Sequence, residues 1–227
     1  MKIIAHIKTD LPEKFGIPRQ SGLAEELEGT IIFEPKYRNP DAFRGLEDFS
    51  HIWILWQFEG TDRERWSPTV RPPRLGGNRH VGVFATRSPF RPNGIGLSSV
   101  RLNSVEYTVD KGQLLHVSGI DLRDNTPIID IKPYLRYTDC HEDAVDGFAG
   151  NVVNYALEVE FPDELLLKLP PEKRQTARKL LSQDPRPSYH SDPSREYGLS
   201  FAGCDIHFRV EDGTARVFDV TEIKPGI

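Results

Sequence analysis

The sequence has few cysteines and no long apolar run. Its two cysteines, Cys140 and Cys204, lie far apart and match no metal-ligand spacing, and a chain of 227 residues needs no disulfide to hold a core. The longest apolar run, residues 52–56, is much shorter than the ~18 to 20 residues of a membrane-spanning helix. The first eight residues are too few and too soon charged for a signal peptide. We therefore expect a cytoplasmic protein that holds no metal and contacts no membrane.

Signatures of several large enzyme classes are also missing. The seven histidines do not cluster, and the sequence contains neither a Gly-x-Ser-x-Gly elbow nor a known Cys–His motif. Residues 93–96 are glycine-rich, but they lack the third glycine and the following helix of a dinucleotide-binding fingerprint. These absences argue against metal chemistry and a covalent nucleophile, and they make a hydrolase a distant alternative.

The residues that are present predict a strand-rich fold around a packed core. Apolar residues make up 37% of the chain, and 18 Gly with 18 Pro favour turns and strands over a helix bundle. Short apolar or alternating runs predict strands near residues 2–8, 30–33, 50–58, 81–86, 97–109, 113–122 and 128–131. The run at 50–58 is apolar on both faces, which predicts a central, covered strand. This pattern predicts an antiparallel sheet or barrel rather than a doubly wound α/β fold.

The composition changes after about Tyr137. Residues 139–150 are acidic and glycine-rich, residues 171–182 predict a helix, and a proline-rich connector follows at 184–189. Asp110-Lys111-Gly112 and Asp212-Gly213 each predict a hairpin turn. We therefore expect a β domain over residues 1–140 and a small C-terminal α+β domain over 141–227.

Charge is spread unevenly along the chain. Residues 63–101 contain eight Arg, no Lys and one acid, so this segment carries about +7 while the whole chain carries −5. Such a segment indicates an anionic ligand, and arginine favours bidentate contacts with phosphate or carboxylate. The alternative is that these arginines pair with acids elsewhere in the chain.

Three segments carry candidate binding chemistry. In residues 15–22, Arg19 and Gln20 are either exposed ligand donors or part of an ordinary polar loop. In residues 87–98, two prolines stiffen a loop that carries two arginines, and its glycines allow close approach of a ligand. In residues 121–134, Asp130 lies within an apolar strand, so it is either paired with Lys132 on the same face or directed into a polar cavity.

Six ordered motifs resemble those of the TsaA-like (TrmO) family, whose characterised members are tRNA N6-threonylcarbamoyladenosine methyltransferases. The motifs are Pro18-Arg19-Gln20, Gly45-Leu46-Glu47 with residues 49–55, Pro72-Pro73-Arg74-Leu75-Gly76-Gly77, Gly82-Val83-Phe84-Ala85-Thr86-Arg87-Ser88, Phe90-Arg91-Pro92-Asn93 with Ile95-Gly96, and Asp130-Ile131-Lys132-Pro133-Tyr134. The stretch Asp184-Pro185-Arg186-Pro187 with Tyr189 resembles the C-terminal signature of the longer bacterial members.

This resemblance implies a homodimeric β-barrel methyltransferase that uses S-adenosylmethionine (SAM). The implied substrate is the anticodon loop of tRNA, at N6 of adenosine 37 after that nitrogen has received its threonylcarbamoyl group. By resemblance, Arg91 and Asp130 are the catalytic candidates. The implied SAM-binding residues are Pro18, Arg19, Gln20, Arg91, Asp124, Asn125, Thr126, Pro127 and Lys132. The implied tRNA-binding residues are Arg87, Arg186 and Tyr189.

The sequence departs from the family pattern in three places. Glu59-Gly60 replaces a His and a polar residue, Asn93-Gly94-Ile95 replaces the commoner Asn-Pro-Ile, and Asp124-Asn125-Thr126-Pro127 replaces Asp-Gly-Thr-Pro. The last change puts Asn where a left-handed backbone is expected. Two other functions stay open on sequence alone: a non-catalytic RNA- or nucleotide-binding barrel, and a SAM-dependent methyltransferase of a substrate other than tRNA.

Overall fold

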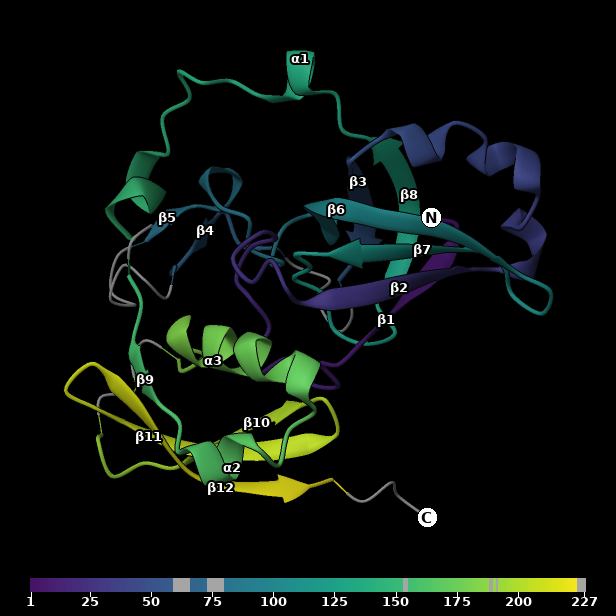
Figure 1. Cartoon of the computed structure of the whole chain (residues 1–227). Helices are drawn as coiled ribbons and strands as arrows, with labels where there is room; N and C mark the ends of the chain where they lie inside the picture. Colours follow the sequence, from purple (N-terminus) through teal and green to yellow (C-terminus); the bar gives the residue numbers. More distant parts are fainter. Residues whose placement is uncertain (59–65, 73–79, 153–154, 188–189, 191, 224–227) are drawn as a thin grey trace.

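Six strands form a closed antiparallel barrel in the order β1-β2-β7-β6-β3-β8 (Figure 1). The computed structural model describes residues 1–58, 66–72, 80–152, 155–187, 190 and 192–223. The barrel strands are β1 (Ala5–Thr9), β2 (Glu28–Phe33), β3 (His51–Gln57), β6 (Ile95–Thr108), β7 (Gly112–Ser118) and β8 (Pro127–Pro133). Inward-facing β-branched and leucine side chains such as Ile7, Ile31 and Leu115 are fully buried, and each contributes about 1.5–3 kcal/mol of hydrophobic stabilisation. The predicted mainly-β fold with an antiparallel barrel is confirmed.

β3 is central in the barrel wall, with β6 on one side and β8 on the other. Its two faces differ, however. Ile52 and Ile54 are fully buried, whereas His51 is exposed and Trp53 and Leu55 are only half-buried. The predicted strand is therefore confirmed, but its expected cover on both faces is wrong. A barrel has one interior, so alternate side chains of β3 must face outward.

The described connections of the barrel include a hairpin turn, 3₁₀ helices and a pair of short strands. The predicted hairpin at residues 110–112 joins β6 to β7. Between β2 and β3 lie η1 (Pro35–Tyr37), η2 (Pro40–Phe43) and η3 (Leu46–Asp48), and between β3 and β6 lie β4 (Thr69–Val70), β5 (Val81–Gly82) and η5 (Val83–Ala85).

A second, four-stranded sheet forms the C-terminal part, in the order β10-β11-β12-β9. Its strands are β9 (Glu158–Glu160), β10 (Tyr197–Phe201), β11 (Cys204–Glu211) and β12 (Thr214–Glu222), and β9 runs parallel to β12. The predicted hairpin at Asp212-Gly213 is confirmed. Both residues have positive φ, 48° and 78°, as a two-residue turn of the primed kind requires.

The predicted helix at 171–182 is present as η7 (Pro171–Lys173) followed by α3 (Arg174–Ser182). The other helical segments are α1 (Arg136–Asp139), η6 (Gly147–Val152) and α2 (Asp163–Leu166). In the part of the chain that the structure describes, no helix is long and apolar enough to cross a bilayer.

α3 lies between the barrel and the C-terminal sheet (Figure 1). Its apolar face, with Ala177, Leu180 and Leu181, is buried in a core that is continuous with that of the barrel. On the barrel side, Lys173 Nζ lies 2.8 Å from Asp10 Oδ2 and 3.6 Å from Glu28 Oε2. These contacts fix the C-terminal sheet against the barrel.

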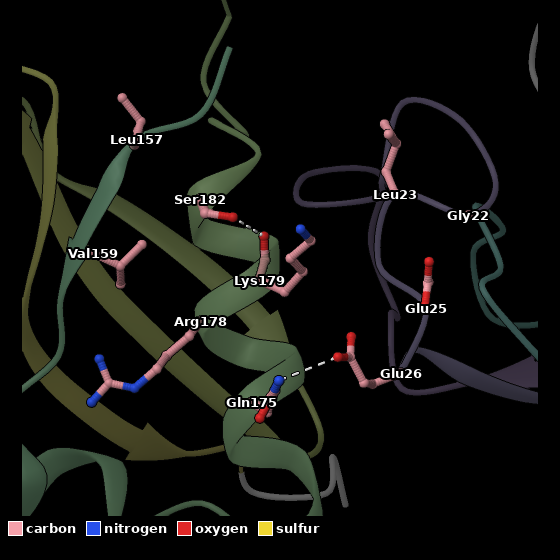
Figure 2. A pocket seen from close by; sticks show the side chains of 10 residues that line it. All are labelled: Gly22, Leu23, Glu25, Glu26, Leu157, Val159, Gln175, Arg178, Lys179 and Ser182. Carbon is pink, nitrogen blue, oxygen red and sulfur yellow. Dashed lines mark hydrogen bonds between the residues drawn. The ribbon is translucent and has the colours of Figure 1, made fainter. Parts of the chain in front are cut away.

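A groove of about 580 Å³ runs between α3 and the loop at residues 22–26 (Figure 2). Gln175 Nε2 spans it and donates to Glu26 Oε1 at 3.3 Å. The lining residues Glu25, Arg178 and Lys179 bear both signs of charge, and none of the predicted site residues lies here. The groove is therefore part of the contact between the barrel and the C-terminal part of the chain.

Candidate active site

A larger cavity of about 1030 Å³, here called the junction cavity, lies where the barrel meets the C-terminal part of the chain. It is lined by loop 14–20, the end of β3 with Phe58, loop 86–91 with the start of β6, residues from 121 to 126, and residues from 180 to 187. Loops 14–20 and 86–91 belong to segments that the sequence analysis selected for their arginines. The fold brings them to one site.

Loop 14–20 is held between the two sheets. Gly16 has φ +88°, and a Cβ atom there would lie 2.0 Å from Cδ1 of Leu199 on β10, so a larger residue would be strained and would displace the Leu199 side chain. The Phe15 ring stacks on Tyr197 with ring centroids 6.2 Å apart. At the other end of the loop, Ser21 Oγ accepts a hydrogen bond from the Ser99 backbone of β6 at 3.2 Å. The loop is thus positioned by both parts of the chain.

Four aromatic side chains contribute to the lining of the junction cavity. Phe15, Trp56, Phe58 and Phe90 all line it, and the Trp56 and Phe58 rings are 4.2 Å apart at their centroids. The backbone register between β3 and β8 shifts at Leu55/Trp56, a bulge that redirects the Trp56 side chain. Gly96 makes room for the indole, because a Cβ atom there would lie 2.2 Å from the Trp56 ring. Such an aromatic surface can stack a purine.

The cationic groups of the cavity come from loop 86–91. Arg91 Nη1 donates to the Thr86 carbonyl at 2.9 Å, which braces the loop across its own turn. Arg87 Nη1 donates to Gln20 Oε1 and so joins this loop to loop 14–20. Both arginines line the cavity together with Pro18, Arg19 and Gln20. Their individual roles stay predictions.

The connector, residues 184–187, forms a further wall through a partly buried ion pair. Arg186 Nε and Nη2 donate to the two carboxylate oxygens of Asp184 at 2.8 and 3.0 Å, and Tyr155 donates to Oδ2 at 2.7 Å. Burial raises the pKa of Asp184, but the hydrogen bonds from Arg186 and Tyr155 outweigh it and hold this pKa below its ordinary value. Arg19 Nη2 donates to the carbonyls of Asp184 and Arg186, both at 3.3 Å.

These contacts change how two of the predicted residues are interpreted. The Arg186 side chain, predicted to contact tRNA, is 14% exposed and paired with Asp184. Arg19, predicted to bind SAM, also anchors the connector to the barrel. Tyr189, the other predicted tRNA contact of this region, lies outside the described residues.

Asp130 and Lys132 do not line the junction cavity. Lys132 Nζ lies 3.0 Å from Asp130 Oδ2, and both side chains are about half exposed. Asp130 Oδ1 accepts from the Ile131 backbone N–H at 2.9 Å. The structure thus agrees with the alternative of a same-face ion pair and does not bring Asp130 or Lys132 to Arg91. The reason is geometric: β8 directs these alternate residues away from the barrel interior.

The turn at residues 124–127 contributes only Thr126 to the cavity lining. Asp124 instead accepts from Lys8 Nζ at 3.1 Å and from the Thr9 backbone at 3.0 Å, which ties the turn to β1. Asn125 has φ +64°, so the left-handed backbone expected there is confirmed. Pro127 is buried at the start of β8. Asp124, Asn125 and Pro127 thus lie outside the lining of the junction cavity, and their contacts with SAM stay predictions.

Asp121 is a cavity residue that the sequence analysis did not select as a site residue. Its Oδ1 accepts a hydrogen bond from Ser98 Oγ at 2.5 Å, and Ser98 Oγ in turn accepts from Trp56 Nε1 at 3.0 Å. Burial raises the pKa of the Asp121 carboxyl, against the opposing effects of Ser98, backbone N–H groups and the charge of Arg87. A partly buried carboxyl with a perturbed pKa in a cavity is typical of functional sites.

Two family models cover most of the chain. The tRNA-methyltransferase O N-terminal domain matches residues 6–140, and the TrmO C-terminal domain matches residues 154–223. The chain belongs to the tRNA-methyltransferase O family. It is therefore an enzyme of a methyltransferase family, as the motifs indicated.

Full-length relatives agree with this assignment. The tRNA (adenine(37)-N6)-methyltransferase of Escherichia coli (strain K12) is 41% identical over 223 residues, which cover 95% of this chain and 94% of the relative. A putative S-adenosylmethionine-dependent methyltransferase RcsF of Pseudomonas aeruginosa is 40% identical over 226 residues, covering 96% and 95%. A crystal structure of TrmO from P. aeruginosa superposes with a TM-score of 0.78 at 35% identity, covering 97% of this chain and 95% of that one.

Proposed function

We propose that this chain transfers a methyl group from SAM to N6 of adenosine 37 in tRNA, once that nitrogen carries its threonylcarbamoyl group. The observation that carries the proposal is the junction cavity, which is lined both by aromatic side chains and by the arginines of loop 86–91. The names of the full-length relatives support the enzyme class, the cofactor and the position in tRNA. The threonylcarbamoyl group rests on the family resemblance and on the chemistry that follows.

The residues of the cavity fit SAM. Phe15, Trp56, Phe58 and Phe90 offer rings for stacking of its adenine, and Arg91 offers a guanidinium for its carboxylate. When bound, SAM supplies a methyl group activated by its sulfonium. The chain then has to hold the acceptor nitrogen in line with that methyl group and to exclude water.

The modified base suits this site better than plain adenosine. The N6 lone pair of adenine is delocalised, whereas in the threonylcarbamoyl form N6 belongs to a urea and its proton is more acidic. A modest base is then sufficient. The modification also carries a carboxylate, and the anticodon loop carries phosphates. Arg87, which is exposed at the cavity, is placed to meet either of these anions.

The test uses purified protein with methyl-labelled SAM and two tRNA pools, with and without threonylcarbamoyladenosine. Nucleoside mass spectrometry then locates the label. We expect label on the modified adenosine alone. Label in neither pool, from a folded protein, would favour the binding-barrel function or a substrate other than tRNA. Label in both pools would remove the requirement for the threonylcarbamoyl group.

We also propose that the enzyme is a cytoplasmic homodimer, as the family resemblance implies. Light scattering coupled to size-exclusion chromatography measures its mass directly. A mass near twice 25.8 kDa is expected, and a monomer at assay concentrations would overturn the dimer.

A further inference from the structure

Asp121 places a carboxylate on the wall of the junction cavity, in the loop between β7 and β8. Its neighbours Ile120 and Leu122 are buried in the core, which fixes the backbone on both sides. The side chain lines the same cavity as Trp56 and Gly96 and is joined to Trp56 through Ser98.

Ser98 and Trp56 fix the orientation of this carboxylate. The Trp56 indole N–H occupies an acceptor position of Ser98 Oγ, so the hydroxyl proton of Ser98 points to Asp121 Oδ1. Ser98 is 0% exposed, so water does not compete for these hydrogen bonds. The two hydrogen bonds therefore point the same way, from Trp56 to Ser98 and from Ser98 to Asp121, and Asp121 Oδ1 is the final acceptor.

Asp121 makes no ion pair with any residue that the structure describes. The charged residues that share the cavity with it are Lys14, Arg19, Arg87, Arg91, Arg123, Asp184 and Arg186. Among them Arg87 lowers the pKa of Asp121 through its charge, while burial raises it. Asp121 is partly buried, and a partly desolvated carboxylate without a salt-bridge partner is suited to take up a proton, because protonation relieves its desolvation.

We propose that Asp121 accepts the proton of N6 during methyl transfer. This inference rests on the proposed function. As the N6–carbon bond forms, the sulfur–carbon bond breaks and its electron pair returns to sulfur, which turns the sulfonium into a neutral thioether. The N6–H bond breaks and its proton passes to the carboxylate of Asp121. One positive and one negative charge disappear together, and the protonated Asp121 later releases its proton to solvent.

The test compares wild type with Asp121→Asn, Ser98→Ala and Asp219→Asn in single-turnover methyl transfer to tRNA carrying threonylcarbamoyladenosine, from acid to mildly alkaline pH. Asp219 is an exposed carboxylate on β12 and serves as the matched control. SAM dissociation constants are measured on the same four proteins, and circular dichroism confirms that each is folded.

We expect Asp121→Asn to lower the rate constant about 100-fold or more while SAM binds within about threefold of wild type. The wild-type rate rises with pH to a plateau. Ser98→Ala moves that rise to higher pH, because it removes a hydrogen bond that lowers the pKa of Asp121. Asp219→Asn behaves as wild type.

Three results would overturn the proposal. The first is an Asp121→Asn rate within about threefold of wild type. The second is loss of SAM binding with an unchanged rate at saturating SAM, which would make Asp121 a cofactor ligand. The third is a Ser98→Ala profile that does not move. If wild type transfers no methyl group at all, the proposed function fails instead, and the two failures are distinct.

Discussion

Replacement of Asp184 by Asn tests whether the connector is held in place by its ion pair. The Asp184 and Arg186 side chains are only 12% and 14% exposed, and Tyr155 donates to the same carboxylate. Asp184 has φ +50°, a conformation that Asn tolerates, so the substitution removes charge without adding backbone strain. It leaves the Arg186 guanidinium partly buried and uncompensated.

Removal of one partner of a buried ion pair costs about 3–5 kcal/mol, and we expect about 3 kcal/mol here because Asn keeps one acceptor oxygen. For a chain of this size that corresponds to a fall in Tm of about 6–12 °C. The assay is thermal unfolding by calorimetry. Glu196→Gln is the control, because its pair with Arg209 is half exposed and should contribute less than about 1 kcal/mol.

The stability lost in Asp184→Asn should depend on pH. The pKa of Asp184 is lowered in the folded chain from its ordinary value of 3.8. Its contribution is therefore present above that value and is lost as pH falls through the folded-state pKa. The difference in Tm between wild type and Asp184→Asn should shrink below about pH 4. A loss below about 1 kcal/mol at pH 7 would refute the reasoning, as would a difference that is constant with pH.

Three further predictions concern the cavity and the joint between the two sheets. Arg91→Ala should lower methyl transfer about 100-fold in initial-rate assays with an unchanged melting curve; near-normal activity would remove its assigned role. Gly96→Ala should displace the Trp56 indole, shift its fluorescence and weaken SAM binding in calorimetric titration, whereas Gly82→Ala, with open space around it, should do neither. Lys173→Met should cost about 1 kcal/mol. Burial lowers the pKa of Lys173, but two carboxylates of the barrel raise it above 10.5, so this contribution is complete below pH 10.5 and is lost as pH rises further. Urea unfolding of wild type and Lys173→Met at pH 8 and above pH 11 measures the difference in their unfolding free energies. An equal difference at both pH values would contradict this prediction.

Local sequence signals were sufficient to predict most of the barrel strands and turns. Period-2 alternation and β-branched residues located the strands, and Asp-Gly turns located the hairpin at residue 212. Asn125 was expected in a left-handed turn because it stands where the family pattern has Gly, and its φ agrees. Such features depend on neighbours in sequence, so sequence is enough to predict them.

Features that depend on distant residues were harder to predict. The signal of a carboxylate between apolar residues selected Asp130, but Asp121 has the same pattern between Ile120 and Leu122. The two differ in their place in the fold, because Asp130 lies on β8 whereas Asp121 lies in the loop between β7 and β8. Sequence alone does not fix where such a loop directs its side chains, because contacts with distant strands decide it. Asp121 meets Ser98 only in the folded chain.

The contacts of the connector, residues 184–187, were also hard to predict from the sequence. Its residues Asp184 and Arg186 form a pair that sequence spacing permits, but Arg19 reaches it from more than 160 residues away. An arginine in a polar loop is equally typical of a ligand donor and of a structural anchor. The fold shows that Arg19 anchors the connector at the wall of the cavity.

The most direct measurement for this account is ultraviolet cross-linking of labelled SAM to the purified protein, followed by peptide mapping. We expect label on the peptides that carry the aromatic lining of the junction cavity, with Trp56 on β3, Phe58 just after it and Phe90 in loop 86–91, and less label in Arg91→Ala. Label on the groove between α3 and loop 22–26, or on the C-terminal sheet, would contradict the assignment of the junction cavity as the cofactor site.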